Sequence, residues 1–267
     1  LFEAQVKATP DKVALVACDK TLTYSQLNKE ANKIAHSLIN MGIGHGDIVG
    51  LMLPRNSYLL SALLGIIKSG AAYLPIDPDH PDDRIQYMLT DSSAKFCIDE
   101  SNIAELLNNS NKNNPESKVC SADLCYCIYT SGSTGMSKGV MLAYKSLWSN
   151  VKYCHDHLSF LKAGDGVVNM LPLAHLYGMI IDMLHTFTKG CHLNFLTRVP
   201  SQKIILGAFA EVKPKLIITV PLILEKIIRN KIFPMLEKPL MKLMLKVPYL
   251  DEKLLAKIKD GLNQAFG

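Results

Sequence analysis

The stretch SYLLSALLGIIKSGAAYLPI, residues 57–76, contains a helix, its end and the strand that follows it. The apolar run Ser57–Ser69 predicts a buried helix that ends at Gly70, and Ala71–Ile76 predicts a strand ended by Asp77-Pro78. Two strands and a helix flank this stretch: strands 48–53 and 95–98, and helix 81–90. Such alternation of strand and helix is typical of a parallel sheet covered by helices, so the predicted fold class is α/β.

The same alternation continues on both sides of this region. A capping box formed by Thr23 and Gln26 predicts a helix from Tyr24 to Met41. After the turn at Gly164-Asp165 a second series of elements is expected, with strands at 167–171, 192–196 and 216–220 and helices at 179–188, 200–213 and from 221 onward. We therefore expect two stacked α/β sub-domains with mostly parallel sheets, residues 1–165 and a truncated second unit at 166–267.

Composition favours a globular protein whose ligands are small and anionic. The 267 residues are 48% hydrophobic and 20% charged, which excludes a disordered chain. The net charge of +5 comes from scattered lysines, so no nucleic-acid partner is expected. Seven irregularly spaced cysteines and the lack of a signal pattern predict a reduced, cytoplasmic protein. The apolar runs are too short to span a bilayer, and the lysine-rich segment 235–250 allows at most a peripheral membrane contact.

The string YTSGSTGMSKG, residues 129–139, carries the clearest chemistry. It follows a predicted strand at 123–129, and a helix is expected after it. Its glycines let the backbone approach a ligand closely, and consecutive N–H groups in such a turn form an anion-binding nest. Four hydroxyls and one ammonium group add donors, from Thr130, Ser131, Ser133, Thr134 and Lys138. These groups suit a polyphosphate, although the string does not fit the Walker A pattern.

This string resembles the phosphate-loop signature of the adenylate-forming enzymes, a superfamily that includes acyl-CoA synthetases, peptide synthetase adenylation domains and luciferase. The resemblance covers essentially the whole chain and implies the N-terminal domain of such an enzyme. It implies that the ATP phosphates are held by Thr130, Ser131, Gly132, Ser133, Thr134, Gly135 and Lys138. One departure is Ser137, because the family usually has proline before this lysine. The serine loosens the loop and leaves its donors in place.

The two halves of the chain resemble different branches of the superfamily. Leu1–Ile98 is similar to peptide synthetase adenylation domains and D-alanine-activating ligases, above all at residues 68–78. Leu171–Gly178 is similar to the P-[LM]-x-H-x-x-G segment of bacterial long-chain fatty acid–CoA ligases. That second resemblance implies that His175 lines the acyl pocket and helps to position the substrate carboxylate, as the catalytic residue of this chain. A hydrogen-bonded structural histidine is the other interpretation.

The pocket segment also differs from that of the amino-acid-activating members, which place an aspartate there to hold the substrate's ammonium group. Leu176 stands beside His175 here, and the nearest acid downstream is Asp182. We expect Asp182 to be a solvated or hydrogen-bonded acid on a helix. Because an unpaired buried ammonium group is costly, this segment favours an apolar acyl substrate.

The resemblance implies further motifs that residues 140–267 do not contain. These are an adenine-binding glycine-rich turn, a glutamate that holds magnesium, a ribose-binding aspartate and a small C-terminal domain with a catalytic lysine. We therefore assign no metal ligand and expect the C-terminal domain to be absent. A chain without these groups is expected to be a poor catalyst, because positioning and electrostatics dominate such transfers.

The expected function is that of the N-terminal part of an AMP-forming acid–thiol ligase, which makes an acyl adenylate and then a thioester. The main expectation is a long-chain fatty acid–CoA ligase of fatty acid metabolism. The implied cofactors are ATP, Mg²⁺ and coenzyme A or a carrier's phosphopantetheine, and the implied partners are a fatty acid or other carboxylate and an acyl carrier protein. Two alternatives stay open: an amino-acid or D-alanine adenylation domain that loads a carrier protein, and a catalytically incomplete nucleotide-binding fragment.

Overall fold

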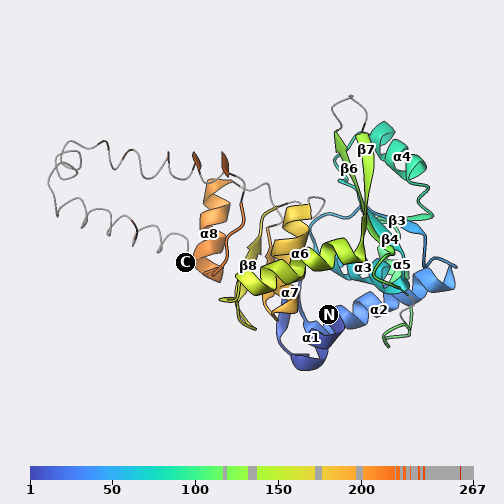
Figure 1. Cartoon of the computed structure of the whole chain (residues 1–267), viewed down its shortest axis with the longest axis horizontal. Helices are drawn as coiled ribbons and strands as arrows, with labels where there is room; N and C mark the ends of the chain where they lie inside the picture. The colour runs from blue at the N-terminus through green and yellow to red at the C-terminus, as the bar shows by residue number, and fades with distance from the viewer. Residues whose placement is uncertain are drawn as a thin grey trace.

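The computed structural model describes residues 1–116, 119–131, 137–171, 176–196 and 201–219, with scattered positions between 221 and 259. Its strands form two sheets that are mostly parallel, and helices pack around both (Figure 1). The predicted α/β class is therefore confirmed.

The larger sheet holds the four strands predicted in the first half of the chain, together with one strand, β7, that was not predicted. Its five strands are β3 (Ile48–Leu51), β4 (Ala72–Pro75), β5 (Phe96–Ile98), β6 (Leu124–Ser131) and β7 (Ser137–Ala143). They lie in the order β5-β3-β4-β6-β7. The first four run parallel, and β7 returns antiparallel beside β6. Helices lie between the successive parallel strands in the sequence, as a parallel connection requires.

Two helices on the larger sheet begin and end where local sequence signals place them. In α3 (Ser57–Ser69), the Asn56 side chain accepts hydrogen bonds from two N-terminal amides, and Gly70 ends the helix with a φ of 91°. In α2 (Tyr24–Asn40), Thr23 and Gln26 form the predicted capping box. The helices predicted at 24–41 and 57–69 are thus confirmed.

Helices cover both faces of the larger sheet. Tyr73 of β4 packs into the main hydrophobic core, which also holds α2 and α3. The next residue, Leu74, packs instead with Ile85 and Met88 of α4 (Asp82–Asp91). Successive side chains of a strand point to opposite faces, so α4 lies across the sheet from α3.

The smaller sheet joins the start of the chain to its second half. Its strands are β1 (Val13–Val16), β2 (Thr21–Thr23), β8 (Gly166–Asn169) and β9 (His192–Phe195), in the order β2-β1-β9-β8. β1 is antiparallel to β2 and parallel to β9, which is parallel to β8. The division at residue 165 stays a prediction, and the pairing of β1 with β9 crosses that position.

In the described part of the chain, further helical segments surround the two sheets: α1 (Phe2–Ala8), α5 (Ile103–Leu106), α6 (Tyr144–His157), η1 (Gly178–His185), α7 (Thr186–Thr188) and α8 (Gln202–Val212). The π-helix η1 and α7 together form the helical segment predicted over 179–188. The two parts of the fold share one core, in which Leu15 and Leu193 of the smaller sheet are buried together with Tyr73 of the larger. This shared core fixes the position of each sheet against the other.

Two sequence expectations were wrong. The string at 129–139 leads into the strand β7 and not into a helix, which starts only at Tyr144. Ser137–Ala143 pair antiparallel with β6, and this pairing gives their backbone hydrogen-bond partners in a strand. The strand expected at 216–220 is not formed, because Leu216–Thr219 adopt neither helix nor strand; Val220 lies outside the described residues.

Candidate active site

The predicted phosphate loop connects β6 to β7, which pair as an antiparallel hairpin. Gly132, Ser133, Thr134 and Gly135 lie outside the described residues. The two ends of the loop are described, and Ser131 pairs with Ser137 across them. The structure thus shows where the loop is anchored and which residues flank it.

Thr130 and Lys138 are direct cross-strand partners at the base of this loop. Directly opposed residues of an antiparallel pair place their side chains on the same face, so the hydroxyl and the ammonium group lie side by side. Both residues are exposed. The hairpin therefore presents one neutral donor and one cation to solvent on the same face, which is suitable chemistry for a phosphate.

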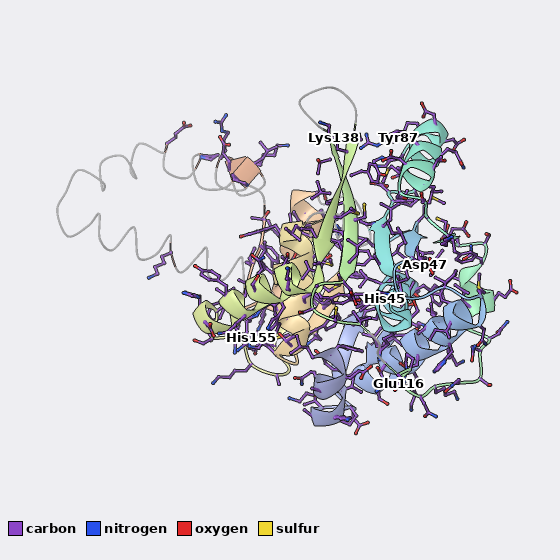
Figure 2. The ribbon with its side chains drawn as sticks, turned by 45° about the vertical axis from the view of Figure 1, so that its right-hand side comes forward. His45, Asp47, Tyr87, Glu116, Lys138 and His155 are labelled. Carbon is purple, nitrogen blue, oxygen red and sulfur yellow. The ribbon has the colours of Figure 1, made fainter. Side chains whose placement is uncertain are left out.

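The helix α4 stands beside this hairpin, as Figure 1 shows. The Tyr87 hydroxyl donates a hydrogen bond to the Ser137 carbonyl over 3.1 Å, and the Tyr129 hydroxyl donates to Asp91 Oδ2 over 2.6 Å. In Figure 2, Tyr87 and Lys138 lie at the same end of the molecule. Tyr87 and Asp91 were not among the predicted site residues, since nothing local in the sequence relates α4 to a hairpin about 50 residues later.

His175, the predicted catalytic residue, lies outside the described residues together with Pro172, Leu173 and Ala174. The segment is flanked by Leu171, which is buried after β8, and by Leu176, which packs against the main core just before η1. The predicted role of His175 at an acyl pocket therefore stays a prediction.

Asp182 of η1 belongs to a buried polar cluster near this segment. Its side chain is 0% exposed, and Asp182 Oδ2 accepts a hydrogen bond from Asn169 Nδ2 over 3.2 Å. Burial raises the pKa of Asp182 to about 8, although the nearby Arg55 charge, the Leu171 amide and the Asn169 amide oppose this rise. Of the two environments expected for Asp182, the hydrogen-bonded one is confirmed and the solvated one is wrong.

Arg55 and Asn169 complete this cluster, and the sequence analysis identified neither. Arg55 Nη1 donates to the Asn169 carbonyl over 3.3 Å, and burial lowers the pKa of Arg55. Asn169 is fully buried at the end of an otherwise apolar strand. A polar side chain inside an apolar run is the signal that could have marked it, because buried polar groups need hydrogen-bond partners.

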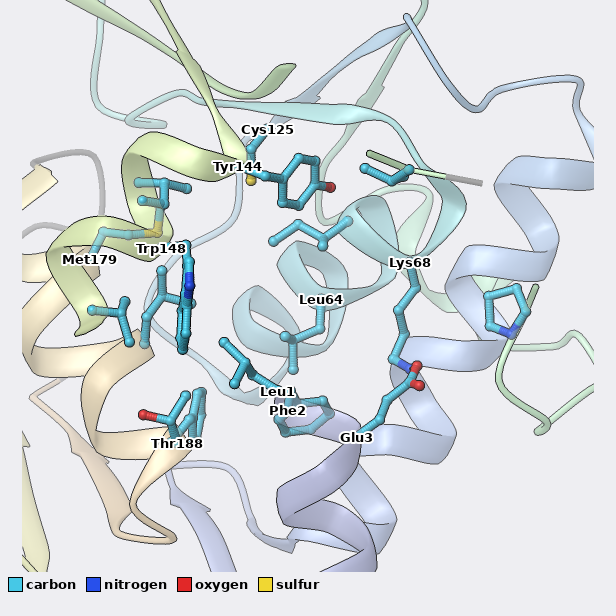
Figure 3. A pocket seen from close by; sticks show the side chains of 17 residues that line it. Leu1, Phe2, Glu3, Leu64, Lys68, Cys125, Tyr144, Trp148, Met179 and Thr188 are labelled. Atoms are coloured by element: carbon cyan, nitrogen blue, oxygen red, sulfur yellow. The ribbon is translucent and has the colours of Figure 1, made fainter. Parts of the chain in front are cut away.

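A cavity of about 350 Å³ lies between α1, α3, α6 and the η1–α7 segment (Figure 3). Its wall is mostly apolar and includes Leu64, Trp148 and Met179. Lys68 and Glu3 form an ion pair at its edge, and burial lowers the pKa of Lys68. None of Thr130, Lys138 and Asp182 lines this cavity, so it is separate from the hairpin and from the polar cluster.

In the described part of the chain, no three His, Cys, Asp or Glu side chains are grouped so that they could hold a metal ion. Among the described helices, none combines the length and apolarity needed to cross a membrane.

The scaffold of two mostly parallel sheets with helices around them matches the fold of the N-terminal domains of adenylate-forming enzymes. The chain belongs to the AMP-binding enzyme family, whose model matches residues 2–266.

The chain is also similar to parts of two peptide antibiotic synthases. The chain is 40% identical to bacitracin synthase 1 of Bacillus licheniformis over 179 residues, which is 61% of this chain and 3% of that protein. It is 36% identical to tyrocidine synthase 3 of Brevibacillus parabrevis over 178 residues, which is 60% of this chain and 3% of that protein. The chain thus spans only a few per cent of these relatives.

Two solved structures share the fold. The N-terminal domain of FACL13 from Mycobacterium tuberculosis matches with a TM-score of 0.76 at 22% identity, over 89% of this chain and 66% of that one. The nonribosomal peptide synthetase FmoA3 matches with a TM-score of 0.76 at 22% identity, over 86% of this chain and 26% of that one. At this identity the likeness supports the fold and not the substrate.

Proposed function

We propose that this chain is the N-terminal part of an enzyme that activates a carboxylic acid with ATP. In the first half-reaction the substrate carboxylate attacks the α-phosphorus of ATP, an acyl–AMP anhydride forms and pyrophosphate leaves. In the second, a thiol attacks the acyl carbon and releases AMP. The observation that carries the proposal is the match of residues 2–266 to the AMP-binding enzyme family.

The hairpin base supports this activity. Lys138 and Thr130 lie on one exposed face, where a cation and a hydroxyl can contact phosphate oxygens. Ser131, Gly132, Ser133, Thr134 and Gly135 would complete the phosphate cradle. Such fixed donors disperse the negative charge that builds up as pyrophosphate leaves.

We further propose that the acid is an amino acid and that the acceptor is the phosphopantetheine of a carrier protein. The relatives that are 40% and 36% identical are synthases of bacitracin and tyrocidine, so the comparisons favour this alternative over a fatty acid. Mg²⁺ bound with ATP and a cytoplasmic location belong to the same proposal.

A long-chain fatty acid–CoA ligase is the second candidate. Its support is the segment around His175, where Leu176 occupies the neighbouring position and the next acid along the chain is Asp182. Coenzyme A would be the acceptor in this case, and His175 would position the fatty acid carboxylate. The sub-domain boundary at residue 165 stays a proposal under either function.

ATP–pyrophosphate exchange tests these proposals, with the protein expressed from its full reading frame. Separate pools of amino acids and fatty acids are supplied, and the 267-residue chain is assayed beside the longer product. Exchange with amino acids would support the first substrate class, and exchange with fatty acids alone would support the second. No exchange with either pool, by a folded protein that binds no ATP, would contradict the proposed activity.

A further inference from the structure

The β6–β7 hairpin extends beyond the sheet that supports it. The pairing of β4 with β6 is confined to Tyr73 and Tyr126, whereas β6 and β7 pair from Leu124 to Ser131. β7 is the last strand of the sheet, so in the described part of the chain its sheet partner is β6. A two-stranded ribbon is only marginally stable alone, and the part that carries the phosphate loop therefore needs support from outside the sheet.

Helix α4 supplies this support on both strands. Tyr87 contacts β7, because its hydroxyl donates to the Ser137 carbonyl over 3.1 Å. Asp91 contacts β6, because its Oδ2 accepts a hydrogen bond from the Tyr129 hydroxyl over 2.6 Å. The two tyrosine rings also meet edge to face, with centroids 6.0 Å apart and planes at 80°.

Gly139 makes room for this arrangement. It pairs with Tyr129 across the hairpin, and a Cβ atom at Gly139 would lie 3.2 Å from the Tyr129 ring. The ring thus lies against the glycine backbone of β7. Tyr129 also packs against the hydrophobic cluster that contains Ile85 and Met88, so α4 and the hairpin share a small hydrophobic cluster.

We propose that Tyr87, Asp91 and Tyr129 are positioning residues that hold the phosphate hairpin in the geometry in which it binds ATP; the proposal rests on the function proposed above. Lys138 directly follows Ser137, and Thr130 directly follows Tyr129. Fixing the two clamped residues therefore fixes the orientation of the two exposed donors. Successive side chains of a strand point to opposite faces, so Tyr129 lies on the face of the hairpin opposite to Thr130 and Lys138.

Tyr87→Phe and Tyr129→Phe test this clamp, since each removes one hydroxyl and keeps the ring. The protein is expressed from its full reading frame, and Tyr153→Phe on an exposed tyrosine of α6 is the control. Amide hydrogen exchange of residues 124–143 is measured without nucleotide, together with Tm and the KM for ATP and for the acid. Loss of one hydrogen bond predicts faster exchange in the hairpin and a rise of about 3- to 10-fold in KM for ATP.

The expected result leaves kcat at saturating ATP, the KM for the acid and Tm close to wild type, because the clamp acts on the ATP loop alone. An unchanged KM for ATP in both variants, while Lys138→Ala raises it, would overturn the clamp and leave the proposed function standing. An unchanged KM for ATP in Lys138→Ala would overturn the phosphate assignment and the clamp with it. Unchanged hairpin exchange in both tyrosine variants would also overturn the clamp, whatever the kinetics.

Discussion

Asn169 Nδ2 donates a hydrogen bond to Asp182 Oδ2 over 3.2 Å in the interior of the protein. Both side chains are 0% exposed, and among the described residues Asp182 Oδ1 has no hydrogen-bond partner. Burial outweighs the attraction of Arg55, so the pKa of Asp182 rises to about 8. At neutral pH this carboxyl group is therefore mostly protonated in the folded protein.

This protonation makes the stability of the fold pH-dependent. Between the ordinary pKa of 3.8 and the folded value of about 8, the folded chain holds a proton that the unfolded chain has released. The free energy of unfolding therefore falls as pH rises, by at most ~1.4 kcal/mol per pH unit. Burial lowers the pKa of His185 from 6.5 to about 4. Between these pH values the unfolded chain holds the extra proton at His185, so this residue makes the free energy of unfolding rise with pH. Between pH 6.5 and 8, His185 therefore does not offset the fall in the free energy of unfolding that Asp182 causes.

Urea unfolding of wild type and Asp182→Asn at several pH values in this window tests the effect. The free energy of unfolding of wild type is expected to fall from pH 6.5 to pH 8, and that of the variant is expected to fall much less over the same range. The asparagine keeps the size of the side chain and cannot ionise. Parallel slopes for the two proteins would show that Asp182 does not titrate in the folded state.

Gly65 sets the distance between α2 and α3. A Cβ atom there would lie 2.7 Å from Ile34 Cβ and 3.1 Å from the Ala31 carbonyl oxygen. Gly65→Ala is therefore expected to destabilise the fold by about 1 to 3 kcal/mol through overpacking, measured by thermal or urea unfolding. Gly207→Ala is the matched control, because Gly207 also lies inside a helix and nothing lies within 4 Å of its added Cβ.

The control is expected to move stability in the opposite direction. Alanine is a better helix former than glycine, so Gly207→Ala is expected to stabilise the protein by up to ~1 kcal/mol. If both glycine variants gained stability, the close approach of α2 and α3 would not be a constraint on residue 65.

Local signals predicted the helices best. The bounds of α3, Ser57–Ser69, were predicted to the residue, and the capping box of Thr23 and Gln26 is present at α2. In each case a residue within one turn decides where the helix begins or ends. The parallel direction of β3, β4 and β5 also followed from the alternation of strand and helix, whereas their order in the sheet did not.

Long-range pairing could not be predicted in this way. Nothing near β1 in the sequence indicates that Leu15 pairs with Leu193 of β9, and nothing near Arg55 indicates a hydrogen bond to Asn169, 114 residues away. The hairpin return of β7 was missed for a related reason. The glycine and serine residues of 129–139 suit a strand–loop–helix connection equally well, and it is the pairing of Ser137–Ala143 with β6 that makes this segment a strand.

Tyr24 offers a test of the contact between α2 and the smaller sheet. It is 0% exposed, and its hydroxyl donates to the Cys191 carbonyl over 2.6 Å, just before β9. Its ring also contacts Phe187 edge to face, with centroids 6.0 Å apart. Tyr24→Phe keeps the ring and removes the donor, so a buried carbonyl loses its partner, and a loss of about 1 to 3 kcal/mol in the free energy of unfolding is expected.

Tyr177→Phe, at a residue 59% exposed, serves as the control and is expected to change stability by less than ~0.5 kcal/mol. Because Cys191 lies beside the strand that pairs with β1, the tyrosine variant should also speed amide exchange in both β1 and β9. Equal stability of the two variants would mean that the Cys191 carbonyl finds another donor when the hydroxyl is removed.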